Sequence, residues 1–405
     1  MGEADAIIDD FIANGGASKP HERMLALARD DRPSLVRLVR RALDDLPRAS
    51  WLVDDALPFL SEDEFSEVVD AAVRTLADNS ESETASNIIA YASLQAPQLL
   101  TKHLLAFWAL RPNQDTGYET WPWRGADDAE VSRLLGVGKS HGDDAELAWR
   151  CLLETRRPSL VTAAARALSG QVGYNDWLKQ VGFTQNGDTL APLHIRSVWH
   201  IQFPEGFFED SKTRCHPTWS SKPIAAPVLT TFGGSANGTC PFCRGSLHHL
   251  LDLPQHVFGV ALNIVTCLSC LGWEESVLFY KHDLSGTPVG LNPDQRQKEP
   301  RFPAGPLRSA QAHLVNSSKR WEVQDWALGR DAGENLNRVG GEPCWVQDPE
   351  YPACLFCSKT MSFLAQLDSN PPIGPGRWWL WGSGGICYVF WCEACRISAL
   401  LWQCT

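Results

Sequence analysis

The motifs that decide the fold are Cys240-Pro241-Phe242-Cys243 with Cys267-Leu268-Ser269-Cys270, and later Cys354-Leu355-Phe356-Cys357 with Cys392-Glu393-Ala394-Cys395. Each set supplies four thiolates in two close pairs, which surround a tetrahedral zinc ion and leave no coordination position open. We therefore predict two structural Zn²⁺ ions. Their ligands are Cys240, Cys243, Cys267, Cys270, Cys354, Cys357, Cys392 and Cys395. Sequence order leaves open whether the ligands group within each set or across the two.

Other chemistry also uses Cys-x2-Cys pairs. A redox dithiol needs one such pair at the start of a helix, whereas this chain has four pairs in one half, so zinc is the preferred interpretation over a dithiol or an iron–sulfur cluster. The remaining cysteines are interpreted as small core residues: Cys151, Cys215, Cys344, Cys387 and Cys404.

Composition indicates a globular protein of two or three domains. The chain has 405 residues, of which 44% are hydrophobic and 21% charged. The acidic N-terminus does not resemble a signal peptide, and no run of about 18 apolar residues suggests a membrane span. We expect a cytoplasmic protein, and in that reducing compartment cysteines serve as metal ligands more readily than as disulfides.

The negative charge is concentrated in the N-terminal half. Residues 1–180 contain 29 acidic and 19 basic side chains, and the rest contains 19 and 17, which together give the net charge of −12. This balance disfavours nucleic-acid binding and is compatible with a basic protein partner, although it could also serve solubility alone.

Residues 1–185 are predicted to form an all-α domain. Apolar residues recur at helical spacing in 35–43 and 65–76, and Ser61 with Glu64 has the form of a capping box. Prolines at probable helix starts recur at Pro33, Pro97 and Pro158, which indicates stacked helical hairpins resembling HEAT repeats. An irregular helical bundle is the alternative. Residues 111–127 are interpreted as an inserted loop.

Residues 186–405 are predicted to form a zinc-binding β-rich domain, which makes the protein α+β. Strands begin within 193–203, and a helix is predicted from Ser309 onward. The domain looks duplicated, with units at about 226–285 and 335–405 related by pseudo-twofold symmetry. Gly233-Gly234 and Gly340-Gly341 precede the two cysteine sets, and we interpret them as turn formers with positive φ.

Catalysis has little support in the sequence. Neither His216 beside Cys215 nor the pair His248 and His249 accompanies a recognisable catalytic motif, so an enzyme is the minority hypothesis. A cluster of tryptophans could pack the core between the two units or present an aromatic surface to a partner: Trp378, Trp379, Trp381 and Trp391.

The stretches 339–357 and 361–368, with Gly384 to Cys392, resemble the YwqG-like family, domain of unknown function 1963. That family in turn is similar to parts of the programmed cell death protein 2 family. The resemblance covers 335–405 well and 190–285 more weakly, and the helical half lies outside it. It implies an α+β protein of two related β units. Bacterial members look like immunity or accessory proteins, and the programmed cell death relatives are regarded as escorts for a ribosomal protein.

We therefore expect a non-catalytic protein that binds a basic protein partner, with no nucleic acid and no membrane involved. The specific prediction is an immunity protein that neutralises a bacterial toxin. An escort or adaptor for a basic client is the alternative, and an enzyme of unknown class stays open.

Overall fold

The chain is described by a computed structural model, over residues 2–14, 21–46, 48, 51–110, 119–140, 142, 144–186, 189–208, 214–219, 227–291 and 299–405. It divides into two compact units. The helical unit comprises Met1–Val181 together with Cys215–Pro217 and Ala327–Glu334, and the sheet unit comprises the rest. The helical unit's first stretch ends at Val181, close to the boundary expected at 185. The sequence did not indicate that two later segments also belong to the helical unit.

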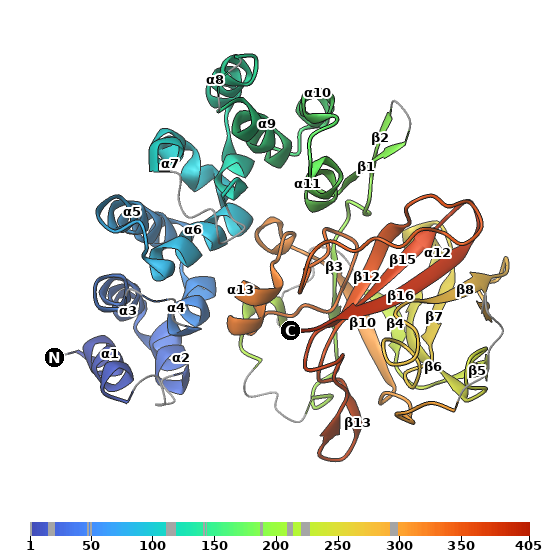
Figure 1. Ribbon diagram of the computed structural model, residues 1–405. Helices are drawn as coiled ribbons and strands as arrows, with labels where there is room; N and C mark the ends of the chain where they lie inside the picture. The colour runs from blue at the N-terminus through green and yellow to red at the C-terminus, as the bar shows by residue number, and fades with distance from the viewer. Residues whose placement is uncertain are drawn as a thin grey trace. The chain divides into compact units, whose positions relative to one another are not determined.

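Successive helices of the helical unit form a curved stack (Figure 1). The α-helices are α1 Glu3–Ala13, α2 His21–Asp30, α3 Arg32–Asp45, α4 Trp51–Ala56, α5 Glu62–Asp78, α6 Glu83–Gln95, α7 Leu104–Leu110, α8 Asp128–Gly138, α9 Ala145–Glu154, α10 Pro158–Leu168, α11 Tyr174–Gln180 and α13 Trp326–Asp331, which crosses the unit boundary. The 3-10 helices are η1 Leu57–Phe59, η2 Pro97–His103 and η4 Trp121–Gly125.

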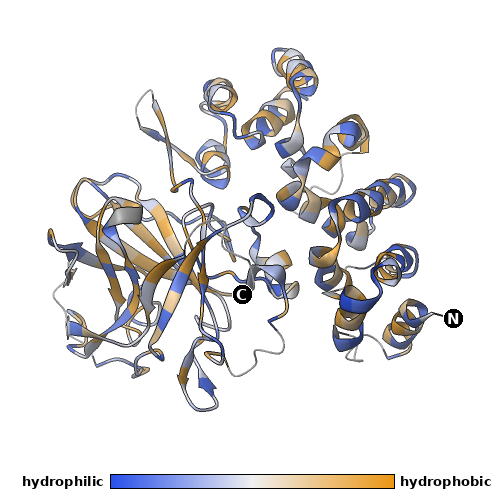
Figure 2. Ribbon diagram, turned by 180° about the vertical axis from the view of Figure 1, so that it is seen from behind, coloured by the Kyte–Doolittle hydropathy of each residue, from blue (hydrophilic) through white to orange (hydrophobic). Residues whose placement is uncertain are grey.

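The prediction that a proline marks the start of an α-helix is confirmed in two of the three segments. Pro33 lies in the first turn of α3 and Pro158 begins α10, whereas Pro97 begins the 3-10 helix η2 instead of an α-helix. The capping box is confirmed, since the Ser61 hydroxyl accepts from the Glu64 amide and the Glu64 carboxylate accepts from the Ser61 amide. Figure 2 shows that the helices carry both hydrophobic and hydrophilic residues, as surface helices do.

The expectation of a loop at 111–127 is wrong for its second part. Residues 111–118 lie outside the described residues, but Trp121–Gly125 forms η4. Trp123 is only 2% exposed, and its indole N–H donates to Glu130 Oε1 at 2.9 Å. The aromatic side chain therefore makes this segment part of the helical core, although Pro122 suggested a break.

Two segments from late in the chain complete the helical unit. The Tyr91 hydroxyl on α6 donates to Glu334 Oε1 at 3.3 Å, and His216 Nε2 lies 3.6 Å from the same oxygen. The Glu334 and His216 side chains are both buried. The helical unit is thus assembled from three stretches of chain.

The sheet unit is built on an antiparallel sheet. Its strand order is β5-β6-β4-β10-β3-β11-β12-β15-β16-β8-β9, with β7 paired to β6. The strands of the unit are β1 Phe183–Asn186, β2 Thr189–Pro192, β3 Trp199–Gln202, β4 Val228–Phe232, β5 Ser235–Thr239, β6 Ser246–Leu253, β7 Leu262–Thr266, β8 Leu278–His282, β9 Pro288–Leu291, β10 Ala310–Asn316, β11 Arg338–Val339, β12 Ser362–Asp368, β13 Pro372–Gly374, β14 Arg377–Trp378, β15 Ile386–Cys392 and β16 Ile397–Gln403. The short helices α12 Gln255–Phe258, η6 Pro217–Trp219 and η7 Lys319–Trp321 are connections.

The prediction of a helix from Ser309 onward is wrong, because residues 310–316 form strand β10 in the interior of the sheet. Ala312 and Leu314 are buried, whereas the alternating residues Gln311 and His313 are exposed. This alternation has the period of a strand, and both neighbours β3 and β4 bond to β10 along its length.

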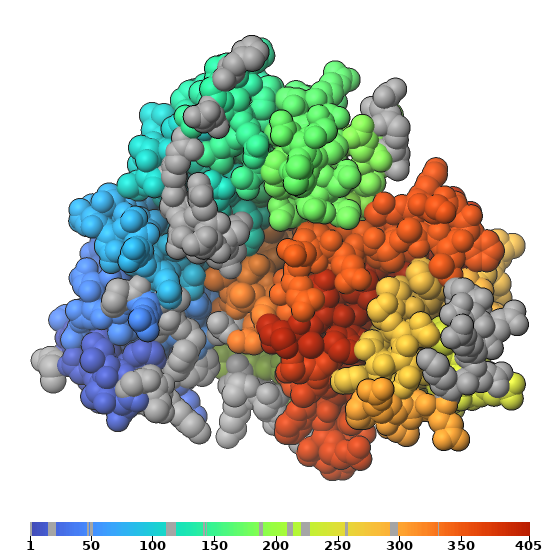
Figure 3. All heavy atoms as spheres, in the orientation of Figure 1, coloured from blue at the N-terminus to red at the C-terminus, as the bar shows by residue number. Residues whose placement is uncertain are grey.

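The pairing of β6 with β7 has the same irregularity as the pairing of β12 with β15. The β6–β7 pairing has a bulge between His249 and Leu251, and the β12–β15 pairing has one between Phe363 and Ala365, 114 residues later. β8, which follows β6 and β7 in the chain, pairs with β16, the strand that follows β12 and β15. The yellow and red segments accordingly lie against each other on the face drawn in Figure 3.

Both glycine pairs have the conformation expected from the sequence. The φ angles are 69° and 106° at Gly233 and Gly234, and 71° at both Gly340 and Gly341. The Gly233 amide donates to Leu250 O, and the Gly340 amide donates to Leu364 O, again 114 residues further on. Each pair thus turns the chain sharply beside the equivalent residue of β6 or β12.

Candidate metal centres

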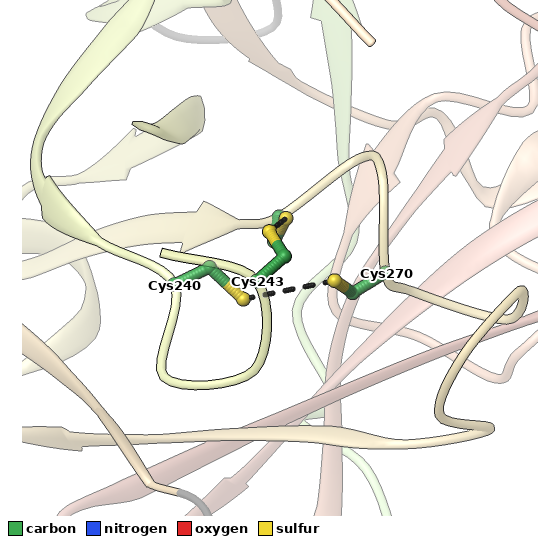
Figure 4. Close-up of side chains that lie close together, drawn as sticks. Cys240, Cys243 and Cys270 are labelled. Atoms are coloured by element: carbon green, nitrogen blue, oxygen red, sulfur yellow. Dashed lines mark hydrogen bonds between the residues drawn. The ribbon is translucent and has the colours of Figure 1, made fainter. Parts of the chain in front are cut away.

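Each cysteine set comes together as one cluster. The Sγ atoms of Cys240, Cys243, Cys267 and Cys270 all lie within 4.8 Å of one another, and so do those of Cys354, Cys357, Cys392 and Cys395. The ligands therefore group within each set and not across the two. In Figure 4 the sulfur atoms of Cys240 and Cys270 point toward each other from two different loops.

The sulfur separations fit a shared metal ion and not disulfides. Sγ of Cys240 lies 3.8 Å from that of Cys270, and Sγ of Cys243 lies 3.6 Å from that of Cys267. In the second cluster Cys357 and Cys392 are 3.7 Å apart. A disulfide would need about 2.05 Å. Four sulfurs at about 2.3 Å from a tetrahedral zinc ion lie about 3.8 Å apart.

The charge of the thiols gives a second reason for a metal ion. Hydrogen bonds with the Cys267 and Cys270 thiols lower the pKa of Cys240 to about 2, while the bond with Cys240 raises the pKa of Cys267 to about 12. One thiolate is thus stabilised by neighbours that stay protonated. Four thiolates this close need a cation, and sulfur donors suit zinc and other soft or borderline metals.

The main chain holds the first pair of each cluster in the same turn. The Arg244 amide donates to Cys240 O and the Ser358 amide donates to Cys354 O, both at 2.9 Å. Both residues have positive φ, 60° and 57°. In the first cluster the Phe242 and Gly245 amides also point at Sγ of Cys240 and Cys243, at 3.4 Å each. Such turns direct two sulfurs and several N–H groups toward one point.

The histidines near the first cluster have other partners. His248 Nδ1 accepts a hydrogen bond from the Leu268 amide. His249 Nδ1 lies 3.0 Å from Gly233 O, and its Nε2 lies 3.1 Å from Asp252 Oδ1. Neither ring belongs to the metal-binding groups found in the described residues.

Three of the five remaining cysteines are buried, as expected for core residues: Cys151, Cys344 and Cys387. Cys404 is half-buried, and the prediction is wrong for Cys215, which is exposed.

Among the tryptophans Trp381 is fully buried and donates to Asp368 O, while Trp378 is 56% exposed. Trp379 and Trp391 pack at the edge of the core. Core packing therefore accounts for most of the tryptophan cluster.

Sequence reasoning missed a polar pocket of about 620 Å³ beside the first cluster's hairpin. It lies against β4, β6 and β7 and contains His249, Asp252 and Asn263. Asn263 Nδ2 donates to Asp252 Oδ1 at 2.9 Å. Desolvation raises the pKa of Asp252, but the hydrogen bond from His249 and the charge of that ring outweigh it, so the pKa lies below its ordinary value. His249 and Asp252 were visible in the sequence, but their proximity depends on the bulge in β6.

Comparisons with known proteins give little further guidance. No protein-family model matches the chain, and no solved structure matches it. The uncharacterized protein YpfL of Salmonella typhimurium is 41% identical over 68 residues, which span 17% of this chain and 15% of that protein. Because this match covers so little of either chain, the resemblance to the YwqG-like family stays a prediction.

Within the described residues, each helix is too short or too polar to cross a bilayer.

Proposed function

We propose that this chain is a non-catalytic, cytoplasmic protein-binding protein whose sheet unit is stabilised by two structural zinc ions. Its specific role in this proposal is that of an immunity protein, which binds and neutralises a cognate bacterial toxin. The observation that carries the proposal is the closure of the two four-sulfur clusters. A metal ion with four cysteine ligands has no position for water or substrate, so it stabilises a surface instead of performing chemistry.

The recurring hydrogen bonds support the finer description of the sheet unit as a duplication. The turns of the first cysteine pairs and the strand bulges repeat after 114 residues, and the glycine bends, 107 residues apart, bond to equivalent residues of β6 and β12. We propose that the two halves are related by pseudo-twofold symmetry about the pair β3 and β10. The predicted units at 226–285 and 335–405 omit both of these central strands.

The helical unit supports a basic partner. Most of its arginines are engaged in ion pairs, for example Arg41 with Asp9 and Asp45. Exposed carboxylates of Asp63, Asp78 and Glu81 have no ion-pair partner in the described part of the chain. A stack of helices with surplus carboxylates is suited to bind a positively charged protein surface.

The test is co-expression with candidate toxins encoded beside this chain, combined with purification of the tagged full chain at moderate and high salt. Immunity predicts that one basic toxin is retained, that its retention weakens as salt rises, and that its toxicity is suppressed. Retention of a ribosomal or assembly protein without any protection would replace immunity with the escort role. Turnover of a small molecule by the purified chain would overturn the non-catalytic proposal.

A further inference from the structure

Four polar residues form a row across the first half of the sheet, one on each of β10, β4, β6 and β7. This open row consists of Gln311, Thr231, Asp252 and Asn263, all of which line the 620 Å³ pocket. Gln311 is paired with Thr231, and Asp252 is paired with Asn263. The Gln311 amide nitrogen Nε2 donates to Thr231 Oγ1 at 3.3 Å, and the pairing of Phe232 with Leu251 brings Thr231 of β4 beside Asp252 of β6.

The second half of the sheet has a matching row on β3, β11, β12 and β15. This closed row consists of His200, Arg338, Gln366 and Tyr388, which are paired in that order. Gln366 stands at the same distance after the strand bulge as Asp252, and Tyr388 takes the place of Asn263. All four residues of the closed row are almost fully buried.

The closed row is covered by the main chain of the protein itself. Gln366 Oε1 accepts from the Cys344 amide at 2.9 Å. The Tyr388 hydroxyl donates to Cys344 O at 2.7 Å and accepts from the Val346 amide at 3.0 Å. Arg338 Nη1 donates to Glu322 O at 3.1 Å. The closed row therefore binds main-chain groups of Cys344 and Val346, and of Glu322 at its Arg338 end.

Among the described residues no such cover lies over the open row, and the chain that precedes the first cysteine is shorter there. Between the glycine pair and the first cysteine there are twelve residues in the second half, 342–353, but only five in the first, 235–239. Those five form β5, which pairs with β6 at the sheet edge. The described residues that line the pocket include the carboxylate of Asp252, 43% exposed, and the His249 ring 3.1 Å from it, but neither lysine nor arginine.

We propose that the open row binds an extended, basic segment of the partner protein, held through its main chain as the closed row holds residues 344–346. In this arrangement a partner amide donates to Asp252 where the Cys344 amide donates to Gln366. A carboxylate in place of an amide oxygen strengthens that bond and favours lysine or arginine near it. This inference rests on the proposed function only in requiring that the partner is a protein.

The test uses the full chain and an array of short synthetic peptides, one series with lysine and arginine at alternate positions and a matched series with glutamate. The basic series should bind and the glutamate series should not. Asp252→Asn should weaken binding by about tenfold or more because it removes the charge of the acceptor, and Leu229→Lys should do the same because it brings a positive charge to the pocket. Leu229 is 59% exposed at the pocket rim, so its replacement leaves the core intact.

Two controls make the test specific. Asp348→Asn removes the same charge from an exposed position outside the pocket and should bind like the wild type. N-methylation of the backbone of a bound peptide should abolish binding, because the proposed contact uses main-chain N–H groups. Equal binding of both series, no binding of either, or full binding by both pocket variants would overturn the inference. If those pocket variants still neutralise a toxin, the proposed function survives while this site does not.

Discussion

Asp252 and Gln366 occupy equivalent positions in the two halves of the sheet: each follows the bulge of its own strand and is paired with Asn263 or Tyr388 on the next strand. Gln366 is fully buried and bonds to backbone groups, whereas the Asp252 side chain is 43% exposed in a pocket. One backbone geometry thus supports a packed core in one half and an accessible polar site in the other. Under the proposed function, metal ions held by the two cysteine clusters would stabilise both hairpins, so the first half could lose packing at the pocket and keep its strand arrangement.

The first prediction concerns metal content. The purified wild-type chain should contain two zinc ions, and Cys243→Ser or Cys357→Ser should remove one of them, as measured by elemental analysis. Cys404→Ser, outside both clusters, should keep two. Two zinc ions in either ligand variant would contradict the assignment.

Chelation should unfold the sheet unit, because structural zinc contributes about 10–16 kcal/mol of apparent binding energy in small domains. The typical net stability of a protein is of similar size or smaller, about 5–15 kcal/mol. Helical circular dichroism should largely persist, but with a lower melting temperature. The reason is that Cys215–Pro217 and Ala327–Glu334 belong to the helical unit while their flanking residues belong to the sheet unit. An unchanged melting temperature of the helices would show that these segments contribute little.

A second prediction concerns the glycine bends. Gly233→Ala would place Cβ 2.3 Å from Arg308 O, and Gly340→Ala would place it 2.0 Å from Ser197 O. Together with the positive φ, this should cost about 2 kcal/mol or more in each case. Gly305→Ala is the matched control, since its Cβ would meet nothing within 4 Å. Denaturant midpoints of the three variants decide the matter, and equal midpoints would exclude a steric role for the bends.

These features differ in how well the sequence predicted them. The cysteine sets, the positive φ of the glycines and the capping box follow from local spacing, and sequence reasoning identified them correctly. Strand β10 was missed because Ala310 to Val315 also fits a helical pattern, and only pairing with β3 and β4 decides between the two. The open row was missed for a related reason: Gln311 and Asn263 come from distant strands, and no local signal links them to Asp252.

A third prediction contrasts two ion pairs of the helical unit. Glu154 is buried with Arg124 and Arg156, whereas Glu67 and Arg40 are both more than half exposed. Glu154→Gln leaves buried guanidinium groups without a countercharge and should destabilise the unit by about 3 kcal/mol or more. Glu67→Gln should cost less than about 1 kcal/mol. Thermal melts would test this, and equal losses would argue against the burial of Glu154.

The same pair predicts a pH dependence. Desolvation raises the pKa of Glu154, but the charges and hydrogen bonds of Arg124 and Arg156 outweigh it, so the pKa falls below its ordinary value of 4.5. A lowered pKa means that the stabilisation is complete above about pH 4.5 and is lost as the pH falls through the folded-state value. Wild type should therefore lose stability in acid more steeply than Glu154→Gln. Parallel pH profiles would show that other carboxylates dominate acid unfolding.

The last prediction separates a structural row from a binding row by stability. Gln366→Ala removes the acceptor of the Cys344 amide and the donor to Leu336 O, and both main-chain groups then lack a partner inside the core. Each such group costs about 1–3 kcal/mol, so the variant should unfold at clearly lower denaturant. Asp252→Asn keeps an oxygen for His249 and Asn263 and lies partly in solvent, so it should cost about 1 kcal/mol or less. If Asp252→Asn is as destabilising as Gln366→Ala, the carboxylate serves the fold, and the pocket is a by-product of the shorter chain before Cys240. If Asp252→Asn leaves stability nearly unchanged while peptide binding is lost, the carboxylate contributes to binding and not to the fold.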